Sequence, residues 1–240
     1  MTEVKNIATR KQVSTKAHGM AGLTASTPTK KALLFSIVQG LCRVLVVRGF
    51  GFKAYGLENI PRTGGVLLAS NHQSYLDPIL LTVHLPRPIT YFAKAYLFKN
   101  PIFGWFILSL HAFPVEPGKG DRAAVNTAIA KLREGHMLTI FPEGHRSADG
   151  KIGPFERGAA LIARRAGVPV VPVAIDGAFD AWPRQCKVFR TRPVHLMYGK
   201  PIDPAGMGAD EFLKVLETEI HRLFAELQEK RQRSGWYDNG

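Results

Sequence analysis

The sequence predicts one α/β domain with a mixed or largely parallel sheet flanked by helices. Its 240 residues suit a single domain that is long enough to bury a core. Hydrophobic residues at 45% and charged residues at 21% are typical of a globular chain. Short apolar runs alternate with segments of helical period, and this alternation favours strands joined by helices in an α/β sheet.

Apolar runs of strand length, bounded by turn residues, predict strands at residues 66–70, 137–141, 168–175 and 194–198. Apolar residues spaced by three or four predict helices at residues 78–84, 121–132, 158–166 and 210–230. Gly135 and Gly167 follow two of these helices, as glycine often does at a helix end. The order of the segments is the alternation expected of an α/β domain.

The N-terminal part of the chain differs from the rest. Residues 1–31 carry basic charges and a single acid, which predicts a disordered basic tail, with an organelle transit peptide as the alternative. Residues 32–52 are predicted to form an amphipathic helix that lies on a membrane or packs on the domain. Its apolar run, residues 32–47, is too short to cross a hydrocarbon core of about 30 Å. Residues 233–240 are expected to be a flexible C-terminus.

The net charge of +13 predicts an anionic partner or surface. No nucleic-acid partner is expected, because the chain shows no groove-reading module and no basic face interleaved with aromatic residues. It also lacks the Gly-x-Ser-x-Gly segment of ester hydrolases and the Gly-x4-Gly-Lys segment of a phosphate-binding loop. No metal site is expected, since Cys42 and Cys186 stand far apart and form no zinc-binding spacing.

A polar segment, NHQSYLD, follows the first predicted strand and leads into a helix. His72 therefore lies at the carboxyl end of a strand, where open α/β sheets bind ligands. Asp77, five residues later, is placed to accept the proton of one imidazole nitrogen and leave the other as a base for a hydroxyl group. Pro78 suits the first helical position, which predicts Asp77 as the N-cap. The alternative is that Asp77 only caps the helix and that His72 is an ordinary loop histidine.

A second segment, FPEGHRS, follows the strand predicted at residues 137–141. Pro142 and Gly144 predict an irregular turn with exposed backbone N–H groups. Arg146 adds a planar cation that suits a phosphate. Taken alone, Glu143 and Arg146 are equally consistent with a surface ion pair.

With four further segments, these two show that the chain resembles the glycerolipid acyltransferase family, whose best-known members are 1-acylglycerol-3-phosphate acyltransferases. The resemblance covers about residues 55–201 and rests on NHQSYLD, YFAKAYLFKNPIFGW, FPVEPGKGDRAAV, FPEGHRS, PFERGAALIARRAG and VPVVPVAIDG. It implies an acyltransferase domain, over residues 53–232, whose α/β core carries the site at one edge while apolar helices touch a bilayer.

The resemblance implies that His72 is the catalytic base and that Asp77 orients it. The base would take the proton of the free hydroxyl of a lysophospholipid, which then attacks the thioester of acyl-CoA or acyl carrier protein. No cofactor beyond this co-substrate and no covalent acyl-enzyme are expected. With 1-acylglycerol 3-phosphate as acceptor the product is phosphatidic acid, a step of phospholipid biosynthesis. The matched substrate-binding positions are Asn71, Lys94, Glu143, Gly144, Arg146 and Ser147.

The chain departs from the family pattern at Pro117, where an arginine usually grips the acceptor phosphate. Lys119 and Arg122 are the nearby candidates to contact that phosphate instead. The departure leaves open another lyso-lipid acceptor, such as a lyso-ornithine lipid, and a non-catalytic membrane-binding relative. A second departure is His145, which stands where threonine is common.

The predicted setting is the surface of an anionic membrane. Residues 97–113 are rich in aromatic side chains and are expected to be an interfacial helix or a core helix. The basic tail adds attraction to an anionic leaflet. The expected location is the cytoplasmic face of the inner membrane, with organelle targeting by the tail as the alternative.

Overall fold

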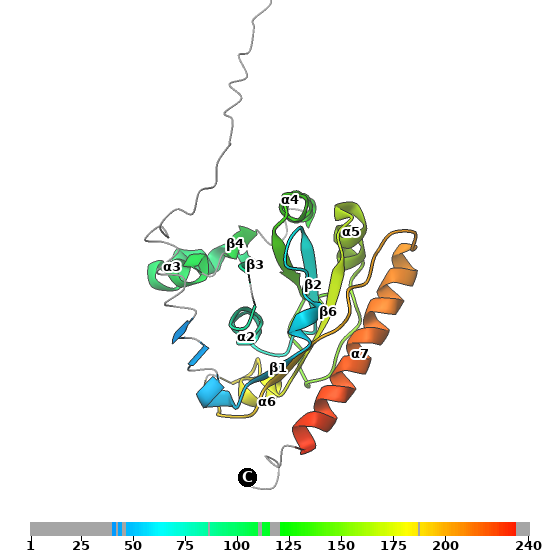
Figure 1. The fold of residues 1–240 in the computed structure, drawn as a ribbon. Helices are drawn as coiled ribbons and strands as arrows, with labels where there is room; N and C mark the ends of the chain where they lie inside the picture. The colour runs from blue at the N-terminus through cyan, green and yellow to red at the C-terminus, as the bar shows by residue number, and fades with distance from the viewer. Residues whose placement is uncertain are drawn as a thin grey trace, which may run out of the picture.

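The fold is seen in a computed structural model that describes residues 47–233 except 86, 110–111, 116–120 and 187, together with residues 40, 41, 43 and 44. Within this part of the chain, seven strands form one sheet in the order β1-β7-β6-β2-β5-β3-β4 (Figure 1). The strands are β1 (Lys53–Tyr55), β2 (Val66–Ser70), β3 (Ile89–Lys94), β4 (Ala112–Val115), β5 (Met137–Ile140), β6 (Val170–Asp176) and β7 (His195–Tyr198).

Helices cover both faces of this sheet (Figure 1). They are α2 (Asp77–Thr82), α3 (Pro101–Ser109), α4 (Asp121–Arg133), α5 (Arg157–Ala166), α6 (Ala178–Ala181) and α7 (Ala209–Arg233), with short 3-10 turns at Leu57–Asn59 and Ala95–Lys99. Among the described residues, no helix combines the length and the apolar character needed to cross a membrane.

The sheet is largely parallel, as the alternation of strands and helices predicts. β2 pairs in parallel with β5 and β6, and β3 pairs in parallel with β4 and β5. Among the seven described strands, the one antiparallel pair is β6 with β7, and β1 then runs parallel to β7. The structure confirms the α/β fold with a mostly parallel sheet.

Alternate residues of β2 point to opposite faces and divide the core in two. Val66 and Leu68 pack in a cluster with α2 and α6, whereas Leu67 and Ala69 pack in a cluster with α4, α5 and α7. All five residues of β2 are buried. A central parallel strand covered by helices on both faces needs this continuous apolar run, and the run made the strand recognisable in the sequence.

Three strands were not predicted from the sequence. β1 is three residues long and half exposed, and the first half of β4 falls inside the aromatic-rich stretch of residues 97–113, so neither stands out as a separate apolar run of strand length. β3 includes Thr90 and Lys94 among apolar residues. Residues 97–113, expected to be an interfacial or a core helix, form the end of a 3-10 turn, then α3, then the start of β4. Pro101 begins α3 and breaks the continuity, since proline suits the first helical turn.

His195 is a buried histidine on β7, 1% exposed, and faces Asp176 across the antiparallel pair. Burial, with the positive charges of Lys53 and Arg231, lowers the pKa of His195 from 6.5 to about 4. Between these two values the unfolded chain takes up a proton that the folded chain does not. The free energy of unfolding therefore falls as the pH drops from about 6.5 towards 4.

We expect the variant His195→Asn to lose less stability over this pH range, because asparagine does not titrate there. The shift in the pKa of His195 corresponds to a loss of roughly 3 kcal/mol in the free energy of unfolding once the pH lies below both pKa values. Denaturant unfolding of both proteins at neutral pH and near pH 4.5 measures the difference. Identical losses in the two proteins would show that His195 is not responsible for the acid sensitivity.

Candidate active site

The site forms where the carboxyl ends of β2, β5 and β6 meet at one edge of the sheet. Because these strands are parallel, the segments that follow them lie next to one another. The backbone N–H of Ser147 donates to the His72 carbonyl at 2.7 Å and joins the two motif segments directly. The tertiary structure thus brings NHQSYLD and FPEGHRS, distant in sequence, into one site.

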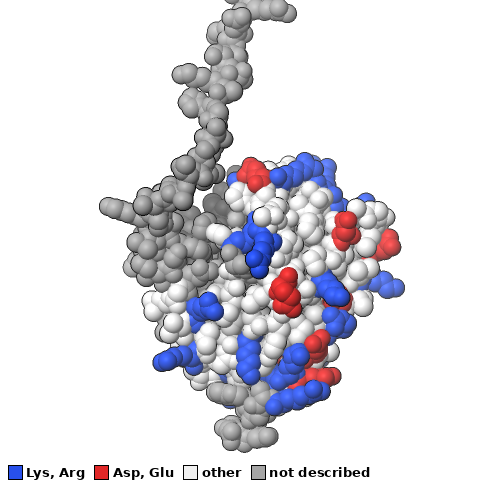
Figure 2. Space-filling view, in the orientation of Figure 1, with Lys and Arg blue, Asp and Glu red and all other residues white. Residues whose placement is uncertain are grey.

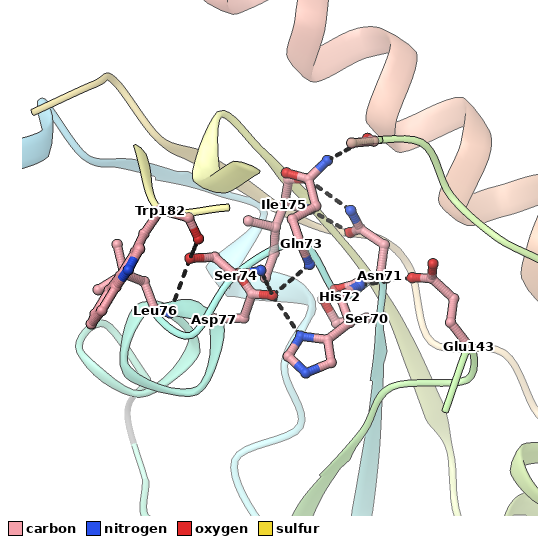
Figure 3. Close-up of polar contacts among 11 residues, drawn as sticks. Ser70, Asn71, His72, Gln73, Ser74, Leu76, Asp77, Glu143, Ile175 and Trp182 are labelled. Atoms are coloured by element: carbon pink, nitrogen blue, oxygen red, sulfur yellow. Dashed lines mark hydrogen bonds and ion pairs between the residues drawn. The ribbon is translucent and has the colours of Figure 1, made fainter. Parts of the chain in front are cut away.

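His72 and Asp77 are in direct contact, with Nδ1 and Oδ2 2.7 Å apart (Figure 3). The same Oδ2 accepts the backbone N–H groups of Gln73 at 2.6 Å and Ser74 at 2.8 Å. Asp77 is fully buried. Since Oδ2 already accepts these N–H groups, Nδ1 is the donor in the contact, and Nε2 carries a free lone pair.

The expectation that Asp77 is the N-cap of the following helix is wrong. Asp77 is the first residue of α2, and Leu76 is in the capping position without a side-chain hydrogen bond. The Asp77 carboxylate turns back to the loop before the helix, where the imidazole and the two N–H groups outcompete the amides of the first turn. The Asp77 carboxylate therefore organises the loop before α2 and does not cap the helix.

The imidazole of His72 is held on one face by an aromatic ring. It stacks on Phe141, with ring centroids 3.8 Å apart and planes inclined by 14°. The side chain is 18% exposed, so the ring is confined but still reachable. Figure 3 shows the second ring nitrogen pointing away from Asp77. This arrangement leaves one basic nitrogen directed out of the loop.

The carboxylate of Glu143, predicted as a substrate contact, accepts two backbone N–H groups. Oε1 accepts the backbone N–H of His72 at 2.7 Å, and Oε2 accepts that of Gly153 at 2.8 Å. Glu143 is 2% exposed, and burial raises the pKa of its carboxyl group while the two N–H groups oppose that shift. Both oxygens are engaged, so Glu143 supports the loop that carries the imidazole.

Asn71 and Ser147 are also turned inward. The Asn71 side chain donates to the Ile175 carbonyl at 2.9 Å and accepts its N–H at 2.7 Å, which ties the ends of β2 and β6 together (Figure 3). Ser147 Oγ accepts the N–H of Gly150 at 2.9 Å and lies 3.2 Å from an Asp149 oxygen. Both side chains are buried and hold the loops in place.

Arg146 lies across the ring of Tyr75, with its guanidinium carbon 3.4 Å from the ring centroid. Tyr75 in turn packs against Trp182, with ring centroids 5.4 Å apart. Arg146 Nη1 is buried and has no hydrogen-bond partner among the described residues. Gly144, two residues before, has a φ of +70°, a left-handed conformation that favours glycine and lets the turn form. The cation therefore has an unused donor beside the His72 loop.

The remaining predicted substrate contacts do not belong to the two motif segments. Lys94 is the last residue of β3. Arg122 is exposed in the first turn of α4. Lys119 and Pro117 lie outside the described residues. Across the part of the chain that the structure describes, no three His, Cys, Asp or Glu side chains gather as a metal site would require.

Sequence reasoning missed the aromatic side chains that surround the site. Phe141 and Tyr75 are part of the two motif segments. Their presence in segments that also carry His72 and Arg146 was the signal from which aromatic contacts could have been predicted. Trp182 follows α6 and is far away in sequence, and its carbonyl accepts from Ser74 Oγ at 2.8 Å. Only the tertiary structure brings it to the site.

The chain matches the model of the acyltransferase family over residues 51–176. It is 34% identical over 191 residues to a 1-acyl-sn-glycerol-3-phosphate acyltransferase of Bacillus subtilis, covering 78% of this chain and 92% of the relative. It is 32% identical over 151 residues to a chloroplastic enzyme of that name from Brassica napus, covering 61% of this chain and 44% of the relative. A crystal structure of the 1-acyl-sn-glycerophosphate acyltransferase PlsC from Thermotoga maritima matches with a TM-score of 0.70 and 29% identity, over 85% of this chain and 84% of that one.

Proposed function

The chain belongs to the acyltransferase family, and on that premise we propose that it moves a fatty acyl group from acyl-CoA or acyl carrier protein to 1-acylglycerol 3-phosphate, giving phosphatidic acid. Family membership makes it an O-acyltransferase. The observation that carries the proposal is the contact of 2.7 Å between His72 and the buried Asp77, which leaves Nε2 of the imidazole as a base.

The proposed reaction needs one base and no covalent enzyme intermediate. His72 Nε2 takes the proton of the acceptor hydroxyl while the oxygen attacks the thioester carbonyl carbon. A C–O bond forms, the C–S bond breaks, and the proton passes from the imidazolium to the departing thiolate. Asp77 keeps Nδ1 protonated and stabilises the imidazolium that forms transiently.

The acceptor phosphate is assigned to Arg146. A guanidinium that stacks on an aromatic ring keeps its planar edge available for a phosphate, and the unused Nη1 supports this role. Arg122 and Lys119 are proposed as further contacts, in place of the arginine that the family usually has at the position of Pro117.

The enzyme is proposed to act at the cytoplasmic face of the inner membrane. Residues 32–52 are proposed as an amphipathic helix that holds the acyltransferase domain, residues 53–232, at the bilayer. Described residues of this helix, Leu41 and Val44, are helical and expose their apolar side chains, which is consistent with a lipid-facing stripe.

The test is a product analysis by mass spectrometry with purified protein in mixed micelles. Palmitoyl-CoA and palmitoyl carrier protein are supplied separately, each with lysophosphatidic acid, other lysophospholipids, lyso-ornithine lipid or glycerol 3-phosphate. Phosphatidic acid from lysophosphatidic acid is the expected product. Transfer to another acceptor alone would make Pro117 the mark of a changed specificity, and transfer to none would indicate a non-catalytic relative.

Arg146→Ala is expected to raise the KM for the acceptor more than the KM for the donor. Loss of a charge-assisted contact with the phosphate corresponds to roughly 10–100-fold in acceptor KM. Steady-state kinetics with each substrate varied in turn measures the split. Arg157→Ala, which removes an exposed arginine paired with Asp210, is the matched control and should leave both values unchanged. Equal increases in the two KM values for Arg146→Ala would contradict the assignment.

A further inference from the structure

A loop of residues 182–192 joins α6 to β7 and borders the site. Trp182 Nε1 donates to the Cys186 carbonyl at 3.0 Å, which closes the first turn of the loop. Gln185 Nε2 donates to the Ala148 carbonyl at 2.9 Å and ties the loop to the segment that follows FPEGHRS. The loop therefore has a defined position next to the site.

The tip of this loop exposes apolar side chains. Val188 is 72% exposed and Phe189 is 54% exposed. The Phe189 ring packs against Phe50 and Trp182, at centroid distances of 5.9 and 6.1 Å. Since Trp182 also contacts Tyr75, a row of aromatic rings runs from the end of the N-terminal helical segment to the edge of the site. The exposed tip is thus continuous with the surroundings of the site.

The same loop is basic. Arg184, Arg190 and Arg192 are exposed, and none of them forms an ion pair with another described residue. The sequence of residues 182–192 contains no acid. Figure 2 shows Lys and Arg side chains, and no visible acidic side chain, over the lower left of the described surface. Asp180 on the neighbouring α6 is paired with Arg231. Exposed apolar residues among unpaired arginines match the chemistry of an anionic lipid surface.

We propose that the 182–192 loop docks on the surface of an anionic bilayer, with Val188 and Phe189 in the headgroup region and the three arginines on lipid phosphates. The inference rests on the proposed function, because a lyso-lipid acceptor resides in the bilayer. Docking at the border of the site holds His72 close to the membrane surface, so that the acceptor reaches it without leaving the lipid phase. This contact is additional to the one proposed for residues 32–52.

The first test measures whether the loop enters the lipid. An NBD fluorophore is attached at Val188→Cys in a background that carries Cys42→Ser and Cys186→Ser. The matched control is Leu161→Cys on α5, an apolar position that is 44% exposed. Vesicles that contain phosphatidylglycerol should shift the emission at position 188 to shorter wavelength and increase it, with little change at position 161. No response at position 188 would overturn the proposal.

The second test measures the contribution of the arginines. The double variant Arg190→Gln/Arg192→Gln should bind phosphatidylglycerol vesicles about 25-fold more weakly, or about five-fold for each charge. Arg164→Gln/Arg165→Gln removes the same charge from the last turn of α5, which lies near the amino ends of the strands and away from the site. This control should have a much smaller effect. Equal weakening in sedimentation assays would mean that only the net charge matters, which also overturns the proposal.

Failure of the inference and failure of the proposed function can be told apart. In detergent micelles the acceptor is supplied without a bilayer, so the loop variants should produce phosphatidic acid at the wild-type rate. If the wild-type protein makes no product in micelles, the proposed function fails, whereas the fluorescence at position 188 still reports lipid docking.

Discussion

His72→Ala is expected to lower kcat for acyl transfer by about 10²–10⁴-fold, the usual contribution of a general base. The structure motivates the size of the effect: Asp77 binds one nitrogen of the imidazole and Phe141 stacks on the ring, which leaves the second nitrogen free to act as the base. Product formation under saturating donor and acceptor measures the loss.

The His72→Ala variant should keep its fold, because the imidazole is partly exposed and its removal leaves the backbone contacts of the loop in place. His136→Ala is the matched control, since His136 is half exposed just before β5, at the opposite edge of the sheet. The control should retain wild-type turnover. Full activity in His72→Ala with unchanged thermal unfolding would refute the assignment of the base.

Asp77→Asn is expected to reduce kcat by about 10²–10⁴-fold and also to destabilise the protein. The amide oxygen carries no full negative charge, so it accepts the imidazole and the N–H groups of Gln73 and Ser74 more weakly than Oδ2 does. The amide NH2 also takes the place of Oδ1, which is buried without a hydrogen-bond partner among the described residues, and so becomes an unsatisfied buried donor. The imidazole then loses the partner that keeps Nδ1 protonated; loss of that partner costs about 10⁴ in a Ser-His-Asp triad. An unsatisfied buried group costs roughly 1–3 kcal/mol.

Two readouts separate the catalytic and the structural parts of the Asp77 effect. Denaturant unfolding gives the loss of stability, and kcat is measured at a temperature where the variant is fully folded. Asp210→Asn, which changes an exposed carboxylate on α7, should alter neither quantity appreciably. A folded Asp77→Asn protein with wild-type kcat would show that the carboxylate only shapes the loop.

Most of the fold could be predicted because its central strands are buried on both faces. β2, β5 and β6 consist of continuous apolar runs, and the helices between them carry one apolar stripe each. The edge strands β1 and β4 escaped prediction for the opposite reason. A short strand at the edge of the sheet, paired with a single neighbour, needs no long apolar run of its own.

The candidate site, like the fold, could be predicted only in part from the sequence. His72, Asp77 and Arg146 were identified from residue type and spacing, and the structure places all three at one edge of the sheet. Glu143, Asn71 and Ser147 have the residue types of substrate contacts, but burial and backbone N–H groups engage them in holding the loops. Sequence spacing does not reveal whether a polar side chain points inward or outward.

The sequence by itself determined the fold class, the acyltransferase family and the candidate pair of His72 and Asp77, because these depend on local patterns: apolar periodicity and short motifs. Only the tertiary structure decided what surrounds them. Parallel pairing of β2 with β5 and β6 brings the motifs together, and the return of the chain after α6 places Trp182 and the 182–192 loop beside them. Such contacts join residues 71 to 108 positions apart, and no local pattern in the chain encodes them.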